Sequence, residues 1–326
     1  MDWCEKQSLH PLHTAVTDLA DFLNDFVKHK TVVPSTLDAI KSCILLTLKL
    51  CTGIDYNSCE LSAITTKYHK DCPASVFTLP KWDLVLVLEK LSQSPFEPIL
   101  TASLKMLTFK CVFLVSMSCS CRLSELHALS FSELSRSKDW SVVYLQPSSD
   151  FLAKNQSSRD PSHTRKFKLE ALVKPPNKVH FTPGSFQQKM YDRNKLFCPV
   201  RVLRVYLSRT AHMRSNKKAL FVSLQPNHAK DITKQSVANW LRRTIKLCYS
   251  LTGNDPDTVS RATAHEIRAI TSSVKFERNL SLQSILHCCT WKHENTFIKH
   301  YLRDVAVLSD NLYQFPPLYM GQSQIK

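Results

Sequence analysis

Residues 101–118 constrain the fold of this chain most, because the stretch is almost continuously apolar. A helix that is apolar on every side has to be covered on every side. The chain contains no run of eighteen apolar residues, so we expect no membrane span and assign the stretch to the core of a globular domain. Its apolar positions include Leu104, Leu107, Phe109, Val112, Phe113 and Leu114.

The length of 326 residues is enough for two domains with cores of their own. Between His69 and Lys81 the helical pattern lapses into Asp-Cys-Pro-Ala-Ser-Val-Phe-Thr-Leu-Pro. Proline and small polar residues of this kind are typical of a linker. We therefore place one domain at residues 1–75 and a second at residues 76–326.

The first domain is predicted to be helical. Residues 14–29 repeat apolar side chains at three- and four-residue intervals, which indicates an amphipathic helix. A proline break then precedes a second helix that ends near Gly53, and a weaker helix covers residues 58–68.

The second domain adds strands to its helices. Helices are predicted at residues 82–92, 101–118, 199–209 and 234–250. Ser141–Leu145 and Arg165–Val173 have strand-like content, and the second alternates cleanly. The predicted fold is mainly α with a small antiparallel β-sheet.

The chain is strongly basic. Forty-three Lys and Arg residues against 27 Asp and Glu give a net charge of +16, which points to a polyanionic partner. The basic residues are dispersed among apolar ones, as in a folded surface that grips a phosphate backbone. Trp240, beside two of them, is at least as well explained by packing. The candidate DNA-binding residues are Arg201, Arg204, Arg242, Arg243 and Lys246.

The twelve cysteines show no regular spacing and no Cys-x-x-Cys pair. Cys43, Cys111 and Cys248 fall inside apolar helical runs, so the cysteines are interpreted as reduced core residues. A small cluster combines thiols with imidazoles, but its two cysteines are adjacent and point different ways on a helix, so we predict no metal there. The cluster consists of His287, Cys288, Cys289 and His293.

Arg122 follows directly after the apolar stretch. A charged group so close to a dry helix is costly unless it is paired, which makes Arg122 a better site candidate than a surface arginine. Glu125 lies one turn further on. It is expected either to hold Arg122 through a bidentate contact or simply to favour the start of the next helix.

A second group of candidates lies within Arg261–Arg303. His265 and Arg268 are three residues apart in a segment without Gly or Pro, so on a helix they share one face. Trp291 is predicted in a turn between helices and Tyr301 in a short amphipathic helix. Guanidinium, imidazole and indole can donate hydrogen bonds to an oxyanion, while a phenol is a latent oxygen nucleophile. A His-x-x-Arg pair by itself arises often by chance.

The polar, Ser-rich interval between the two predicted strands holds Lys154. It is predicted to be a loop of the small sheet. Lys166, in the second predicted strand, is the competing candidate for a lysine at the site.

These residues occur in the order and approximate spacing of the tyrosine recombinase (phage integrase) family, which the sequence resembles from about residue 14 to about residue 306. Four phrases are most similar to the recombinases of DIRS-type retrotransposons: Pro-Lys-Trp-Asp-Leu-Val-Leu-Val-Leu, Ser-Pro-Phe-Glu-Pro-Ile, Arg-Leu-Ser-Glu-Leu-His-Ala-Leu-Ser and Trp-(x)4-Thr-Phe-Ile-(x)2-Tyr. The pattern departs from the family at Cys121 and Ala269, neither of which removes a catalytic group. The matching residues are Arg122, Lys154, His265, Arg268, Trp291 and Tyr301.

The resemblance implies a helical core-binding domain that clamps DNA and a catalytic domain that cleaves and rejoins it. Arg122 and Arg268 would bind the phosphate, with His265 and Trp291 completing the cage, and Tyr301 would attack phosphorus. In the family a hairpin carries the catalytic lysine, and Phe-Leu-Ala-Lys resembles its position. No cofactor is expected, because the donors need no metal and the sequence offers no carboxylate cluster to hold one.

The expected partner is double-stranded DNA, bound by a homo-tetramer that exchanges C-terminal segments. The start, Met-Asp-Trp-Cys-Glu-Lys, lacks the apolar stretch of a signal peptide, so we expect synthesis in the cytoplasm and action in the nucleus. One alternative is a catalytically silent, domesticated DNA-binding protein of the same fold. Another is a helical protein-interaction module whose basic charge serves acidic proteins.

Overall fold

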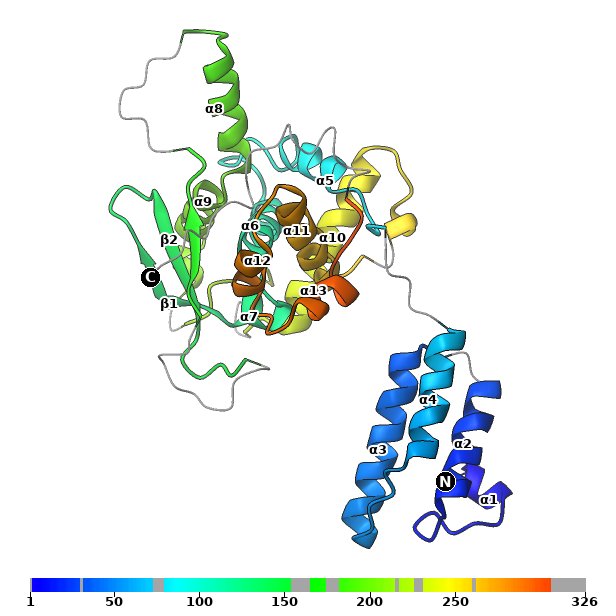
Figure 1. Cartoon of the computed structure of the whole chain (residues 1–326). Helices are drawn as coiled ribbons and strands as arrows, with labels where there is room; N and C mark the ends of the chain where they lie inside the picture. Colours follow the sequence, from blue (N-terminus) through cyan, green and yellow to red (C-terminus); the bar gives the residue numbers. More distant parts are fainter. Residues whose placement is uncertain are drawn as a thin grey trace. The chain divides into compact units, whose positions relative to one another are not determined.

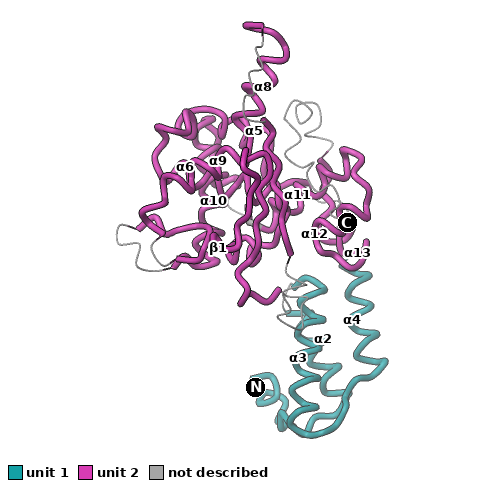
Figure 2. The backbone as a smooth tube through the Cα atoms, turned by 90° about the vertical axis from the view of Figure 1, so that its left-hand side faces the viewer, with its two compact units in different colours: residues 1–76 teal, residues 77–326 magenta. Residues whose placement is uncertain are grey.

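The computed structural model describes residues 2–29, 32–72, 79–153, 165–173, 182–214, 217–225, 231–259 and 262–305. The chain divides into two compact units, residues 1–76 and residues 77–326 (Figure 2). Helices dominate both units, and the second contains a small antiparallel sheet (Figure 1). The predicted fold class, mainly α with a small antiparallel sheet, is confirmed.

Unit 1 is a small helical bundle. Its core is built from one face of each long helix, and Tyr68 donates from its hydroxyl to the carbonyl of Val32 at 2.7 Å. Its helices are α1 (Asp2–Lys6), α2 (Val16–His29), α3 (Pro34–Thr52) and α4 (Cys59–Asp71). The buried core consists of Leu19, Leu23, Leu37, Leu48, Tyr56 and Leu61.

The cysteines of the two units differ, and one prediction about them is wrong. The interpretation as core residues is wrong for unit 1, where Cys43, Cys51, Cys59 and Cys72 are exposed; on α3 the core face is occupied by Leu37 and Leu48. Cys111 and Cys248, in unit 2, are buried as predicted, and all twelve cysteines are free.

Unit 2 is built around α6 (Leu104–Cys119), the apolar stretch of the sequence. Ser103 caps its first turn by accepting a hydrogen bond from the backbone N–H of Met106, and Ser120 ends it in the left-handed conformation with φ 45°. Nearly every residue between these caps is buried, as an all-apolar helix requires. The end of α6 is therefore a fixed point in the core.

Several helices of unit 2 pack around α6. Helices α9 and α10 both pack against α6, and α5 packs against α10. Helix α8 projects from the rest of unit 2 (Figures 1 and 2). The elements are α5 (Leu84–Leu91), α7 (Leu123–Ala128), α8 (Phe186–Phe197), α9 (Pro199–Arg209), η2 (Ala211–Met213), α10 (Lys234–Leu251), η3 (Pro256–Val259), α11 (Ala264–Glu277), α12 (Leu282–Cys289) and α13 (Glu294–His300).

The sheet has the order β1-β2-β3, with both neighbouring pairs antiparallel. Strands β2 (Val142–Pro147) and β3 (Phe167–Glu170) coincide with the two predicted strands. Strand β1 (Leu129–Arg136) was not predicted, because most of its side chains are polar and exposed. Its register with β2 shifts between Ser130 and Ser135, as at a β-bulge.

One buried ionic group joins α6 to α9. Lys110 is fully buried and donates to Glu97 Oε1 at 2.6 Å and to the carbonyl of Leu91 at 2.7 Å. Burial lowers the pKa of Lys110 to about 8, although Glu97 opposes the shift. Arg201 donates to both oxygens of Glu97, at 2.8 and 3.2 Å. The three charges therefore depend on one another.

Among the described residues, no helix has both the length and the apolar character that a membrane span requires.

Candidate active site

Arg122 stands at the junction between α6 and α7. The left-handed Ser120 turns the chain out of α6, and Arg122 is the N-cap residue of α7. Glu125, buried in the first turn of α7, accepts from the backbone N–H of Arg122 at 2.6 Å and from its Nη1 at 3.3 Å. Glu125 therefore stabilises the start of α7, as one of the two expected roles has it, while the predicted bidentate contact is replaced by a contact with one guanidinium nitrogen. Nη1 also donates to Thr290 Oγ1 at 3.0 Å.

Arg268 lies in the middle of α11 and is 2% exposed. Its Nη2 donates to the carbonyl of Cys289 at the end of α12. Its Nε and Nη1 are buried and have no hydrogen-bond partner within the part of the chain that the structure describes. Buried guanidinium N–H groups without acceptors are costly, and two such donors on one planar group have the geometry to bind an oxyanion.

Aromatic rings surround the Arg268 guanidinium. Its Cζ lies 4.9 Å from the ring centroid of Trp291 and 5.4 Å from that of Tyr301. The Trp291 and Tyr301 centroids are 4.3 Å apart, and the His265 and Tyr301 centroids are 4.6 Å apart. Trp291 lies in the predicted turn between α12 and α13, and Tyr301 is the C-cap residue of α13. Residues distant in the sequence therefore meet around one guanidinium.

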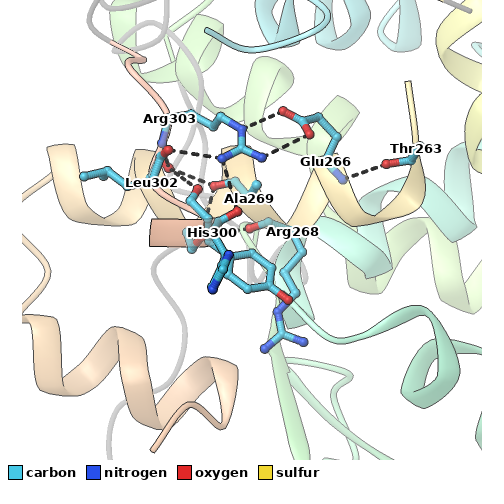
Figure 3. Close-up of polar contacts among 10 residues, drawn as sticks. Thr263, Glu266, Arg268, Ala269, His300, Leu302 and Arg303 are labelled. Carbon is cyan, nitrogen blue, oxygen red and sulfur yellow. Dashed lines mark hydrogen bonds and ion pairs between the residues drawn. The ribbon is translucent and has the colours of Figure 1, made fainter. Parts of the chain in front are cut away.

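Two contacts attach the Tyr301 segment to α11. Ser273 donates from its hydroxyl to the carbonyl of Tyr301 at 3.1 Å and accepts from the backbone N–H of Arg303 at 2.8 Å. Arg303 in turn forms an ion pair with Glu266, whose backbone N–H is held by the N-cap residue Thr263 (Figure 3). The backbone of the Tyr301 segment is thus tied to the helix that carries Arg268.

A buried lysine connects α11 to the end of α6. Lys275 is 4% exposed and donates to Ser120 Oγ at 2.8 Å. Ser120 lies two residues before Arg122 and Lys275 lies on the helix of Arg268. The elements that carry Arg122 and Arg268 are therefore joined by the hydrogen bond between Lys275 and Ser120.

The charges of the site shift two pKa values. Burial lowers the pKa of His265 below its ordinary value although the residue keeps an exposed edge, and the charge of Arg268 lowers it further. Burial also lowers the pKa of Arg268, and the nearby Arg122 contributes in the same direction. Arg268 remains protonated, because a guanidinium does not lose its proton in a protein. The lowered pKa of His265 favours its neutral form near neutral pH.

The structure brings Arg122 and Arg268 together through contacts with the end of α12, and Glu125 holds Arg122. Arg268 in turn meets the rings of Trp291 and Tyr301, and His265 meets the ring of Tyr301. Lys154 lies outside the described residues. Lys166 is exposed, and the strand alternation sets it on the face opposite to the buried Phe167. The choice between Lys154 and Lys166 stays a prediction.

The candidate DNA-binding residues have different surroundings. Arg243 is exposed on α10, Lys246 forms an ion pair with Asp257, and Arg242 donates to Asn239. Trp240 is 8% exposed, which agrees with packing.

Two further candidates lie on α9. Arg201 is engaged with Glu97, whereas Arg204 lies over the ring of Trp140. Both line a groove of about 450 Å³.

The thiol and imidazole cluster is not assembled. Cys288 and Cys289 are buried, while His287 and His293 are exposed. In the described ranges no three His, Cys, Asp or Glu side chains are arranged to hold a metal ion.

Sequence reasoning missed three residues that shape the site. Thr290 ends α12 in the left-handed conformation, φ 51°, and accepts from Arg122. Glu266, on α11, forms an ion pair with Arg303, which follows α13. No periodicity marks these positions, since each acts through a contact distant in the sequence.

No protein-family model matches the sequence. No curated protein matches it either. Solved structures do: the chain is similar to a XerH site-specific recombinase bound to its difH substrate in a pre-cleavage complex, with a TM-score of 0.47 and 12% identity over 92% of this chain and 70% of the other.

A lambda integrase dimer bound to a COC′ core site is similar with a TM-score of 0.47 and 10% identity over 96% of this chain and 68% of the other. A lambda integrase tetramer bound to a Holliday junction has a TM-score of 0.47 and 12% identity over 90% and 65%, respectively.

Proposed function

We propose that the chain is a site-specific DNA recombinase that cleaves and rejoins strands through a 3′-phosphotyrosyl intermediate. The observation that carries the proposal is the surroundings of Arg268. Its buried guanidinium has two nitrogens that find no acceptor among the described residues, and its Cζ lies 5.4 Å from the ring centroid of Tyr301. A cation of this kind beside a phenol suits a phosphodiester under attack.

The two arginines would neutralise the phosphate. A phosphodiester resists attack because its oxygens already carry charge, and the pentacoordinate transition state concentrates more charge on them. Arg122 and Arg268 approach from α7 and α11, and Trp291 adds an indole N–H donor. Guanidiniums fixed before the substrate arrives do not have to reorganise during the reaction.

Tyr301 would supply the nucleophile. Its oxygen forms a bond to phosphorus as the bond to the 5′-oxygen of the next nucleotide breaks. A phenol has a pKa of about 10, so it needs positive charge nearby and a proton acceptor. The ring of His265, tilted by 42° with its centroid 4.6 Å from that of Tyr301, is the candidate acceptor. Lys154 would protonate the departing oxygen, and the 5′-hydroxyl of a second strand would reverse the step.

The finer parts of the proposal follow from the sequence resemblance. Unit 1 would clamp the duplex as a core-binding domain, and unit 2 would carry the tyrosine recombinase catalytic fold. The protein would act in the nucleus as a homo-tetramer on two DNA sites, exchanging C-terminal segments. Its biological role would be the integration of a DIRS-type mobile element.

Covalent trapping tests the proposal without knowledge of the target sequence. The full chain is expressed in cells, protein-bound DNA is purified under denaturing conditions, and the attached ends are sequenced. We expect discrete ends joined through a 3′-phosphate with the wild-type chain and none with Tyr301→Phe, which keeps the ring but lacks the hydroxyl.

An unchanged adduct in Tyr301→Phe removes Tyr301 from the mechanism. DNA binding without any adduct in the wild-type chain supports the silent DNA-binding alternative. A chain that does not bind duplex DNA at low salt supports the protein-interaction alternative.

A further inference from the structure

Arg165 is a charged residue that the proposed mechanism does not use. It lies two residues before Phe167, the first residue of β3. Alternation along an extended chain places both side chains on one face, and Phe167 is fully buried. The Arg165 guanidinium carbon lies 4.2 Å from the Phe167 ring centroid, and the side chain is 15% exposed. The sheet thus directs this arginine inward.

Arg165 faces the carboxylate that holds Arg122. Its Nη1 lies 3.6 Å from Glu125 Oε2, close enough for an ion pair and too far for a good hydrogen bond. Both Nη1 and Nη2 are buried and have no hydrogen-bond partner in the described ranges. Glu125 therefore lies between two guanidiniums, one of which is left with unused donors.

The charges of this group do not balance in the absence of a ligand. Arg122, Arg165 and Arg268 provide three positive charges, and Glu125, within electrostatic reach of all three, provides one negative charge. The excess matches the two negative charges of a pentacoordinate phosphate at the transition state.

Glu125 by itself would oppose that phosphate. Its Oε1 occupies Arg122 Nη1 at 3.3 Å, and its charge would repel an anion bound to the same guanidinium. Arg165 can take up this carboxylate, since a small movement of Glu125 Oε2 toward Nη1 completes a hydrogen bond. Arg122 is then released toward the anion while its backbone N–H still orients α7.

We propose that Arg165 is a positioning residue of the phosphate site, which holds the charge of Glu125 so that Arg122 is free to bind the phosphate. The inference rests on the proposed function, because it requires a phosphate at Arg122 and Arg268. Arg165 is not a proton donor in the reaction, since its guanidinium stays protonated. It acts through Glu125.

Orthovanadate, which can expand to five coordinates as phosphorus does in the transition state, is the probe. Its binding to the full-length chain is measured by vanadium NMR titration at constant ionic strength. We expect Arg165→Gln to weaken binding about tenfold, as for the loss of one charge-assisted contact. Arg165→Lys keeps the positive charge, and its affinity for vanadate is expected to lie between those of the wild type and Arg165→Gln.

Lys168→Gln is the matched control. Lys168 lies on the same strand but on the opposite face, where it pairs with Glu170. This variant should bind vanadate as the wild type does. Melting temperatures of all variants show that folded chains are compared, and Arg165→Lys keeps the test valid if Arg165→Gln does not fold.

A double-mutant cycle separates a role through Glu125 from a general structural role. In a Glu125→Gln background no carboxylate charge remains to be held, so Arg165→Gln should change binding by less than about twofold. A tenfold loss that persists in that background overturns the proposed route through Glu125.

Failure of the inference and failure of the proposed function give different results. Wild-type and Arg165→Gln chains that bind vanadate equally well overturn the role of Arg165 alone. A wild-type chain that does not bind vanadate overturns the phosphate site as well.

Discussion

Arg303 donates to both carboxylate oxygens of Glu266, from Nε at 2.8 Å and from Nη2 at 3.3 Å. The two side chains are 10% and 2% exposed. Glu266 lies between His265 and Arg268 on α11, and Arg303 lies two residues beyond Tyr301. The pair therefore fixes the end of the Tyr301 segment to the helix that carries the buried arginine.

Removal of one partner of this pair should be costly. Arg303→Gln leaves the Glu266 carboxylate buried without its cation, and we expect the free energy of unfolding to fall by about 3–5 kcal/mol. Urea denaturation followed by circular dichroism measures the change. Lys299→Gln, at an exposed position on α13, is the control and should stay within about 0.5 kcal/mol of the wild type. Equal stability of the two variants would contradict a structural role for the pair.

The planar set of N–H donors on Arg268 should affect the rate of covalent adduct formation more than the affinity for duplex DNA. Arg268→Lys keeps the positive charge but loses the planar set of donors, and the rate of covalent adduct formation should fall about 10²- to 10³-fold. Single-turnover trapping on the DNA ends identified with the wild-type chain gives this rate. Duplex affinity, measured separately by gel shift, should change little. A variant that forms the adduct at the wild-type rate would show that Arg268 does not contact the phosphate.

His265 predicts the acid side of the pH–rate profile. Burial and the charge of Arg268 lower its pKa from the ordinary value of 6.5, so the neutral, proton-accepting form prevails at pH 7. The rate of adduct formation should thus be flat near neutrality and fall only as the pH drops below about 6.5 through the lowered pKa.

His265→Gln should be slower at every pH and should lack this acid limb. The same limb in the variant would assign the titration to another group. Circular dichroism over the pH range controls for unfolding. A histidine whose pKa is lowered by folding also makes the folded protein less stable as the pH falls.

Arg243 and Arg201 should respond differently to loss of charge. Arg243 is exposed on α10, so Arg243→Gln should reduce the slope of log Kd against log salt by about one without changing stability. Arg201→Gln removes a partner of Glu97 beside the buried Lys110 and should lower the free energy of unfolding. Filter binding at several salt concentrations measures the first effect, and urea denaturation curves measure the second. An unchanged slope for Arg243→Gln would place the DNA elsewhere.

Strong periodicity made much of the fold predictable. The all-apolar run of α6 could only be a core helix, and the alternation of β3 matches its observed burial. Strand β1 is held mainly by backbone pairing with β2, which leaves no alternating pattern. Helix α8 projects from unit 2 and buries only Phe197, so it has little apolar periodicity to detect. Elements that bury apolar side chains could be predicted from the sequence, whereas β1 and α8, which bury few, could not.

The site was predictable only where residue chemistry was unusual. The spacing of His265 and Arg268 on one helix indicated convergence, and both contact the Tyr301 ring. Arg165 and Thr290 gave no such indication, because an arginine before a strand and a threonine after a helix are common. Their roles depend on contacts with Glu125 and Arg122, which are distant in the sequence and which no local pattern encodes.

Helices α12 and α13 support the Tyr301 segment through an apolar cluster of their own, whereas the two site arginines are supported by the main core. Trp291 and Phe297 belong to a small apolar cluster distinct from the main core, and Tyr301 packs against it. Arg122 and Arg268, in contrast, are held by elements joined through Lys275 and Ser120. The position of the nucleophile therefore depends on the Glu266 and Arg303 pair and on the two Ser273 contacts, whereas the two arginines are held through a separate link.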